Sequence, residues 1–490
     1  MKRSIVWLRR DLRLGDNVAL YEACRRTERV CLAFVVNPPL LADDRMGAPL
    51  VAVFFGALAA LRSDLRARGS DLAVLRGDFA GQLGTLAARI GAEAVFYNED
   101  YEPEAIVRDR EVTAALEMRG LRVHAFLDHV YFGADEIAQN DGSPYRIFTP
   151  YKRRWLESRA VARRSPLRSE RALVGTLLAP AEIGATEAVP TPEAFGFTPS
   201  DAYPKASEAS AQERLADFLD DGAPVERYKT DRNVPATAGT SQLSPQLRAG
   251  TIGIRTCVER AFERRDAAVG DVRVNVETWI SEIVWRDFYQ MILRRFPHVA
   301  TGPFLEAAAR IVWRSPDGDL EAWSHGRTGF PIVDAAMQQL NTCGWMHNRL
   351  RMIVASFLTK NLLLDWRLGE RYFERHLADA DLAQNNGGWQ WAASTGLDAA
   401  PYFRIFNPVS QSKQFDPDGA FIKAMIPALR SVPSDFIHEP WTMPPLLASS
   451  LGIVIGSTYP APLVDLAASR ARALATFKSA FGLATVGRSL

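Results

Sequence analysis

The sequence has little cysteine, and it lacks the spacing that would build a disulfide framework or a metal site. Four cysteines occur in 490 residues, and none forms a C-x-x-C pair. We therefore expect free thiols in a reducing compartment. The seven histidines show no H-E-x-x-H or related ligand spacing, so no metal site is predicted.

The chain also lacks long apolar runs and an excess of one charge. No stretch approaches the ~20 apolar residues that a membrane helix needs, and the run Ile5 to Leu8 is too short for a signal peptide. The 58 basic residues nearly balance the 57 acidic ones, which leaves a net charge of +1. A nucleic-acid-binding surface is neither indicated nor excluded, because binding depends on a local basic groove. We expect a cytoplasmic monomer.

What is present is a clear alternation of element types in residues 1–130. Short apolar runs predict five strands, at Ser4–Leu8, Val30–Val36, Asp71–Leu75, Ala94–Asn98 and Leu121–Leu127. Helical patterns lie between them, including Leu50–Arg68 and Glu104–Arg119, each followed by a glycine suited to a C-cap (Gly69 and Gly120). This alternation predicts a Rossmann-like α/β domain with a parallel sheet covered on both faces.

The pattern changes twice after residue 130. Prolines are frequent within residues 131–205, which predicts a long interdomain linker without long elements. Residues 206–490 carry helical periodicity and nine of the eleven tryptophans. The expected helices are Val274–Phe296, Ile332–Thr342, Met346–Leu364 and Arg371–Ala378. The predicted fold class is therefore an α/β domain joined to an all-α domain.

The stretch Asp379–Phe406 holds the greatest density of potential chemistry. Two carboxylates (Asp379 and Asp381), a run of amides, a glycine pair and two tryptophans follow one another in DADLAQNNGGWQWAA. Glycines permit close approach of a ligand, and amides hydrogen-bond without carrying charge. The segment suits a flat, redox-active heterocycle; the alternative is a helix-to-helix loop rich in turn residues.

Three further segments combine polar and aromatic residues. In EIVWRDFY, a helix would place Glu282, Trp285 and Arg286 on one face, for stacking on a base or as a salt bridge beside a core tryptophan. In GWMHNRLRM, Asn348, Arg351 and Met352 would share a face with Arg349 pointing away; the alternative is a solvated basic stripe.

The third segment, YKTDRNVPATAGTSQLS, ends just before a predicted helix. Free backbone N–H groups and hydroxyls there could hold a diphosphate, although the P-loop pattern is absent. A capping box formed by Ser241 and Ser244 explains the same residues.

Taken together and in this order, these segments resemble the photolyase/cryptochrome family. The resemblance runs from IVWLRRDLRLGDN (Ile5–Asn17) to AAPYFRIFNP (Ala399–Pro408), which is most of the chain. It implies non-covalent FAD at the centre of the helical domain. The residues that match cofactor contacts are Tyr228, Thr240, Ser241, Gln242, Leu243, Ser244, Arg286, Asn348, Arg351, Asp379, Asp381 and Asn385.

Within the family, the chain resembles class I-type photolyases that repair cyclobutane pyrimidine dimers. Asn385 matches the asparagine that photolyases carry at the flavin N5 position, where plant-type cryptochromes carry aspartate. Enzymes that repair (6-4) lesions carry a histidine pair in the GWMHNRLRM region, whereas here His347 is followed by Asn348. The residues that match the dimer pocket and neighbouring DNA contacts are Glu282, Trp285, Asn348, Met352, Trp391, Arg232, Arg349 and Arg404.

The resemblance also implies a mechanism. UV-damaged DNA is bound through its phosphates, the dimer is flipped out, and an electron passes from photoexcited, reduced FAD to the dimer. Glu282 would hydrogen-bond the dimer and stabilise its radical anion. The residues matching the electron relay that re-reduces FAD are Trp389, Trp366 and Trp313.

Two questions stay open at this level. A second, light-harvesting chromophore is expected in many relatives, but the residues typical of methenyltetrahydrofolate binding are not found, so a folate, a deazaflavin, another flavin or no chromophore are all compatible with the sequence. The rival functions are a cryptochrome photoreceptor, a (6-4) photolyase, and a nucleic-acid-binding module without catalysis. Asn385 and the absence of a long tail after residues 475–490 favour repair over signalling.

Overall fold

The computed structural model describes residues 1–482, so the end of the segment 475–490 lies outside the described residues. The chain forms two compact units. Unit 1 comprises residues 1–228, 240–297 and 378–383; unit 2 comprises residues 229–239, 298–377 and 384 onward.

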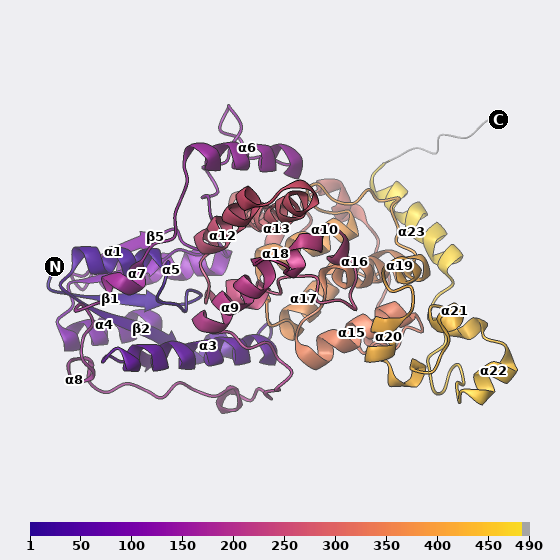
Figure 1. The fold of residues 1–490 in the computed structure, drawn as a ribbon, viewed down its shortest axis with the longest axis horizontal. Coiled ribbons are helices and arrows are strands. Elements are labelled where there is room, and N and C mark those ends of the chain that lie inside the picture. Colours follow the sequence, from indigo (N-terminus) through magenta and orange to yellow (C-terminus); the bar gives the residue numbers. More distant parts are fainter. Residues whose placement is uncertain (483–490) are drawn as a thin grey trace. The chain divides into compact units, whose positions relative to one another are not determined.

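Unit 1 contains the parallel sheet, the helices that lie between its strands in sequence, and part of the helical region that follows (Figure 1). Its main elements are β1 Arg3–Leu8, α1 Val18–Arg26, β2 Arg29–Val36, α2 Pro38–Leu41, α3 Ala48–Ala67, β3 Ala73–Arg76, α4 Phe79–Ile90, β4 Ala94–Asn98, α5 Pro103–Glu117, β5 Arg122–Phe126, α6 Phe148–Val161, α7 Ser169–Ala172, α8 Pro180–Ile183, α9 Glu208–Leu219, α11 Ser244–Ala249, α12 Ile254–Ala267 and α13 Gly270–Arg295.

Unit 2 is helical, and most of α18 belongs to it. Its main elements are α14 Asp319–Ser324, α15 Pro331–Cys343, α16 Asn348–Ser356, the π-helical turn η5 Phe357–Asn361, α17 Trp366–His376, α18 Leu382–Ala393, α19 Pro408–Phe415, α20 Ala420–Met425, α21 Ser434–Ile437, α22 Pro445–Ser450 and α23 Leu466–Ala480. The short helix α10, Tyr228–Asp231, is divided between the units: Tyr228 belongs to unit 1 and the residues that follow it belong to unit 2.

The five strands predicted from the apolar runs form one parallel sheet in the order β3-β2-β1-β4-β5. Alternate residues of each strand enter two cores, as a two-residue period requires. One core packs α1 and α3 against the face that carries Val6 and Phe96, and the other packs α4 and α5 against the face that carries Ile5 and Val95. The predicted Rossmann-like domain, followed in sequence by helices, is confirmed.

α3 is the one described helix that is long and apolar enough to cross a membrane by length and composition. It is interrupted by charged residues, including Arg62 and Asp64. Its apolar side chains, among them Leu58 and Leu61, are buried in the core on one face of the sheet, as in a core helix.

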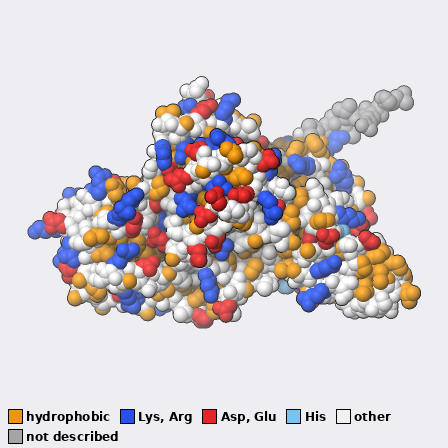
Figure 2. All heavy atoms as spheres, viewed as in Figure 1, with side chains coloured by type: hydrophobic (Ala, Val, Ile, Leu, Met, Phe, Trp, Pro, Cys, Tyr) orange, Lys and Arg blue, Asp and Glu red, His pale blue; other side chains and the backbone are white. Residues whose placement is uncertain are grey.

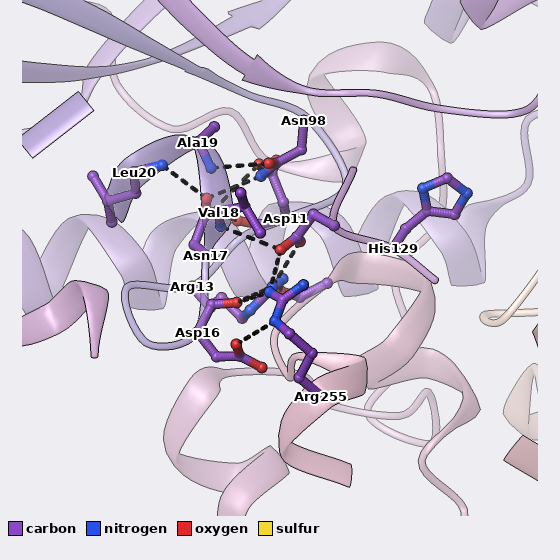
Figure 3. Close-up of polar contacts among 12 residues, drawn as sticks. Asp11, Arg13, Asp16, Asn17, Val18, Ala19, Leu20, Asn98, His129 and Arg255 are labelled. Atoms are coloured by element: carbon purple, nitrogen blue, oxygen red, sulfur yellow. Dashed lines mark hydrogen bonds and ion pairs between the residues drawn. The ribbon is translucent and has the colours of Figure 1, made fainter. Parts of the chain in front are cut away.

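A buried polar network follows β1 and joins it to α12 (Figure 3). The guanidinium of Arg255 donates to Asp16 Oδ1 at 2.7 Å and to Asp128 Oδ1 at 2.6 Å. Asn98 donates to Asp11 Oδ2 at 2.7 Å, while Asn17 caps α1 by accepting from the Leu20 N–H. Buried charges that are paired in this way hold the RRDLRLGDN segment in one conformation.

The linker is more ordered than its prolines suggest. The sequence analysis expected no long element in residues 131–205, but α6 has 14 residues and buries Phe148, Tyr151 and Trp155. This expectation was wrong because six of the eight prolines in this segment lie C-terminal to α6, and Pro150 stands in the first turn of the helix, where proline is tolerated.

Two expectations for the helical part also needed correction, and one alternative is excluded. The helix expected over Met346–Leu364 begins at Asn348, where His347 accepts from the Arg349 N–H, and it continues into the π-helical turn η5. α17 begins five residues earlier than expected, because Asp365 caps it by accepting from the Arg367 N–H. The glycine-rich stretch after Asp381 is the helix α18, not a loop.

Candidate functional site

The middle of α13 presents the predicted Glu282, Trp285 and Arg286 on consecutive turns, and all three are half-buried. Trp285 stacks on Phe148 of α6, with ring centroids 3.6 Å apart and planes 8° apart. Arg286 donates to the carbonyl of His129. The prediction that α13 carries a polar and aromatic face is confirmed, and the role of that face in binding a ligand stays a prediction.

Asp381, an expected cofactor residue in unit 1, is held by an arginine and a glutamine. Arg10 Nη2 donates to its Oδ2 at 2.5 Å, and Gln290 Nε2 lies 3.0 and 3.2 Å from its two oxygens. Burial alone would raise the pKa of Asp381, but Arg10, Arg248 and Arg286 hold it at about 2. The buried carboxylate is therefore ionised and can only accept hydrogen bonds.

Polar atoms without partners accompany this carboxylate. Within residues 1–482, Gln290 Oε1 and both ring nitrogens of His129 are buried and contact no hydrogen-bonding protein atom. Burial lowers the pKa of His129 to about 4, so the ring is neutral and offers one donor and one acceptor. Orphaned buried polar groups of this kind fit a polar heterocyclic ligand.

The segment expected to bind a diphosphate precedes α11. Thr240, Ser241 and Gln242 are half-buried, and Gln242 has a φ of 49°. The alternative capping box is wrong: Leu243 is the N-cap of α11 and makes no side-chain cap, and Ser244 is the first helical residue. Tyr228 is buried and packs edge-on against Phe218 at 5.7 Å.

In unit 2, α18 carries Asn385 against α17. Asn385 Nδ2 donates to the carbonyl of Glu370 at 3.0 Å, and Asn386 Nδ2 donates to Glu370 Oε1 at 2.8 Å. The amide of Asn385 is thereby oriented through its nitrogen. Burial raises the pKa of Glu370 to about 8, so no carboxylate charge faces this pair of amides at neutral pH.

The first turns of α16 carry Asn348, Arg349, Arg351 and Met352, as predicted. Arg351 Nε donates to the carbonyl of Met346 at 2.9 Å, which turns its guanidinium back toward the helix start.

Arg349 leaves that face, also as predicted. It donates to Asn233 Oδ1 at 2.7 Å and lies over the ring of Phe415. Burial lowers the pKa of Arg349, and so do the nearby charges of Arg232 and Arg404. The three arginines expected to contact DNA therefore lie within electrostatic reach of one another. A cluster of like charges with this geometry favours an anion such as phosphate.

The clustering is local. On the face drawn in Figure 2, Lys and Arg side chains are interspersed with Asp and Glu side chains. This agrees with the net charge of +1, and it makes a local group of arginines more important for binding a polyanion than the overall charge.

The three expected relay tryptophans lie in unit 2. Trp389 and Trp366 are buried and Trp313 is half-buried. α17 approaches Trp389 so closely that a Cβ on Gly369 would lie 2.1 Å from the indole ring. Trp391 is half-buried two residues further along α18.

Several residues that shape this site were missed by the sequence analysis. Arg10 supports Asp381, Phe148 supports Trp285, and Glu370 supports the amides of Asn385 and Asn386. Each supporting residue is distant in sequence from its partner, so no local pattern reveals it. Only Arg10 stood within a segment already singled out, IVWLRRDLRLGDN.

Comparison with known proteins agrees with this geometry. A family model described as the FAD binding domain of DNA photolyase matches residues 279–479, and one described as DNA photolyase matches residues 4–169. Deoxyribodipyrimidine photo-lyases of Vibrio cholerae and Escherichia coli are 39% and 38% identical to the chain, cover 98% of it, and are themselves covered over 100% and 99% of their lengths.

The chain belongs to the DNA photolyase family. Among solved structures, a bacterial class III photolyase from Agrobacterium tumefaciens has a TM-score of 0.88 and 33% identity, with 98% of each chain covered. A Synechocystis sp. cryptochrome has a TM-score of 0.86 and 26% identity, covering 97% of this chain and 99% of its own. The expected family, FAD-binding domain and photolyase fold are confirmed; photolyases and cryptochromes share the fold.

Proposed function

We propose that the chain is a photolyase that repairs cyclobutane pyrimidine dimers in DNA, working as a cytoplasmic monomer. The observation that carries the lesion assignment is the face of α16, where Asn348 and, one turn later, Met352 stand in the region that holds a histidine pair in (6-4) enzymes. The full-length photo-lyase relatives support the same substrate.

FAD, when bound and reduced, supplies the photoexcited electron that opens the dimer. The fit of unit 1 to a flavin rests on Asp381 and its neighbours, because an ionised carboxylate and orphaned polar atoms match the donors and acceptors of a heterocycle. The segment Thr240–Ser244, Tyr228 and Arg286 are assigned to the rest of the cofactor, together with Asp379.

In unit 2, Asn385, Asn348 and Arg351 are assigned to the cofactor. The nitrogen of Asn385 is held by the Glu370 carbonyl, so its oxygen is free to face the flavin N5 region as an acceptor. A neutral amide at this position avoids placing a second negative charge beside a reduced, anionic ring.

Lesion binding is assigned to both aromatic and charged groups. Trp285 and Trp391 would pack against the bases of the flipped dimer, where stacking contributes about 1–3 kcal/mol per base. Glu282 would hydrogen-bond the dimer and stabilise the negative charge that develops on it. Arg232, Arg349 and Arg404 would hold phosphates next to the lesion.

The electron relay is assigned to Trp389, Trp366 and Trp313. Gly369, which touches the Trp389 ring, is one helical turn from Trp366 on α17. Arg314, the residue after Trp313, donates its backbone N–H to the carbonyl of Leu363 at 2.9 Å. This hydrogen bond joins the chain next to Trp313 to the segment that precedes Trp366. These contacts support short steps between consecutive rings.

A second chromophore is assigned to a cavity of about 340 Å³ beside the carboxyl end of β4. Tyr97, Asp100, Tyr101 and Arg294 are among its lining residues, and carboxyl edges of parallel sheets are the usual ligand crevices. An archaeal photolyase from Sulfolobus tokodaii that contains two FAD molecules is 31% identical to the chain, with a TM-score of 0.80 and with 97% of this chain and 100% of its own covered. A deazaflavin or a second flavin fits this assignment better than a folate; extraction and chromatography of the bound chromophores would identify it.

The experiment that tests the function is repair of an oligonucleotide with one thymine cyclobutane dimer. Reduced protein is assayed under blue light and in the dark, with a (6-4) lesion in parallel. Light-dependent repair of the cyclobutane dimer alone is expected. Repair of neither lesion, despite bound and reducible FAD, would indicate a cryptochrome instead.

A further inference from the structure

Arg10, in the loop after β1, has a buried guanidinium surrounded by carboxylates. Its side chain is 9% exposed. Nη1 lies 3.1 Å from both Asp100 Oδ1 and Glu102 Oε1, and Nη2 lies 2.5 Å from Asp381 Oδ2. Burial would lower the pKa of Arg10, but Asp100, Asp381 and Glu102 together raise it above its ordinary value. One side chain therefore connects the loop after β4 with Asp381.

The backbone at Arg10 is fixed by the end of α11. Gly250 has a φ of 69°, and a Cβ on it would lie 1.9 Å from the Arg10 carbonyl oxygen, so this close approach requires glycine. The Leu12 N–H donates to the Ala249 carbonyl at 3.2 Å. Arg10 is thus held at both ends: its backbone packs against the end of α11, and its guanidinium is hydrogen-bonded to three carboxylates.

Asp381 depends on this arrangement because it is 6% exposed. The charged groups that act on it come from three other elements: Arg10 after β1, Arg248 on α11 and Arg286 on α13. The neutral His129, after β5, adds no charge at pH 7. Arg10 hydrogen-bonds Asp381 directly, so it acts on the direction of the carboxylate lone pairs as well as on its charge.

We propose that Arg10 is a positioning residue for the flavin, which it serves by holding Asp381 in the orientation that accepts a hydrogen bond from an imide N–H of the ring. The proposal rests on the assignment of Asp381 to the cofactor. The competing explanation is that Arg10 only joins the loops after β1 and β4 through Asp100 and Glu102.

The neighbouring Arg9 offers a matched control. Its side chain is 11% exposed, it is paired with Asp109, and it belongs to the same loop. It lies over the rings of Trp7 and Tyr97. Arg9→Gln therefore removes a paired arginine of comparable burial, whose guanidinium interacts with Asp109 and the Asn98 carbonyl.

The test measures FAD release from the full-length holoprotein by the rise in flavin fluorescence, from pH 5.5 to 8.5. Wild type, Arg9→Gln, Arg10→Gln, Arg10→Lys, Asp381→Asn and the double variant Arg10→Gln/Asp381→Asn are compared, with thermal unfolding recorded for each. Arg10→Lys retains the charge without the planar fork, which keeps the test informative if Arg10→Gln fails to fold.

Arg10→Gln is expected to release FAD about tenfold faster at pH 7, the size of one charge-assisted hydrogen bond. Release should accelerate further as the pH falls, because the buried carboxylate becomes easier to protonate, whereas wild type and Arg9→Gln stay flat. In the double variant, Arg10→Gln should add little to Asp381→Asn, since both act through one carboxylate.

Four results would overturn the inference. Additive effects of the two substitutions, or equal acceleration in Arg9→Gln, would show that Arg10 acts only as a scaffold. Faster release from Asp381→Asn with unchanged release from Arg10→Gln would refute the role of Arg10 alone. Unchanged release from Asp381→Asn would refute the assignment of Asp381 to FAD, and the role of Arg10 with it.

Discussion

Phe148 lies flat on Trp285, with ring centroids 3.6 Å apart and planes 8° apart. Phe148 is the first residue of α6, in the segment that the sequence analysis expected to be a linker without long elements, and Trp285 is assigned to the lesion pocket. A stacked partner restricts the indole to one rotamer before any ligand arrives. Such preorganisation lowers the entropy that binding must remove.

Phe148→Leu should therefore weaken binding of dimer-containing DNA about three- to tenfold, the contribution of one aromatic pair, while binding of undamaged DNA is unchanged. Both dissociation constants are measured by fluorescence anisotropy. Phe132→Leu is the control, because Phe132 is also buried in unit 1 but packs on Tyr131 and Trp155. Equal losses in the two variants would mean that the effect is one of stability, not of the pocket.

Substitution of Arg349 should separate affinity from chemistry. Arg349→Gln is expected to weaken binding of damaged and undamaged DNA alike and to reduce the slope of log K against log salt by about 1, as for one lost phosphate contact. The repair rate of bound, reduced enzyme should not change. Arg273→Gln, at an exposed arginine paired with Glu277, should leave the slope unaltered. A repair rate that fell while the salt slope stayed constant would place Arg349 on the dimer itself.

Glu370 should make stability depend on pH. Its folded pKa, about 8, is raised by burial above its ordinary value of 4.5. Between pH 4.5 and pH 8 the folded state therefore binds more protons than the unfolded state. The free energy of unfolding is highest below pH 4.5 and falls as the pH rises toward 8. Glu370→Gln should remove this loss, with a gain relative to wild type that grows from pH 5 to 8 and reaches at most a few kcal/mol. Thermal unfolding across this range, with the exposed Glu306→Gln as control, measures it; a constant difference would contradict the assigned protonation.

The sequence predicted the sheet well because each strand is a short, uninterrupted apolar run, which is how a strand buried on both faces reads. β4 was placed at its observed bounds, Ala94–Asn98. The glycine caps Gly69 and Gly120 both have a φ of 79°, as expected of residues that end a helix.

α18 shows why local propensity misled. Its Asn385, Asn386 and the following glycine pair are typical of turns, yet tertiary hydrogen bonds override that preference. Asn386 Nδ2 also donates to the Val299 carbonyl, and Gln390 Oε1 accepts from the Phe304 N–H. Such contacts join residues about 90 positions apart, and no window of sequence reveals them.

The same holds for the candidate site. Residue types and their order, together with the family resemblance, supplied the positions that are assigned to ligands, but not the residues behind them. Arg10 and Asp381 are 371 positions apart, and no sequence pattern connects them. Supporting residues are set by the packing of elements, which a one-dimensional pattern does not encode.

Trp313→Phe should slow photoreduction of oxidised FAD by at least about tenfold, because phenylalanine is harder to oxidise and the relay would end at the buried Trp366. Repair by enzyme that is already reduced should be unaffected, since the electron that opens the dimer returns to the flavin and the relay is not used. Trp313 is half-buried and touches Phe477 edge-on at 5.9 Å, so phenylalanine keeps most of its packing. Trp441→Phe, at another half-buried tryptophan of unit 2, is the matched control and should photoreduce at the wild-type rate. Photoreduction is followed by loss of the oxidised flavin absorbance under blue light with a thiol reductant. Loss of repair in the pre-reduced Trp313→Phe protein would remove Trp313 from the relay and assign it to the repair step, and unchanged photoreduction would mean that electrons reach Trp366 by another route.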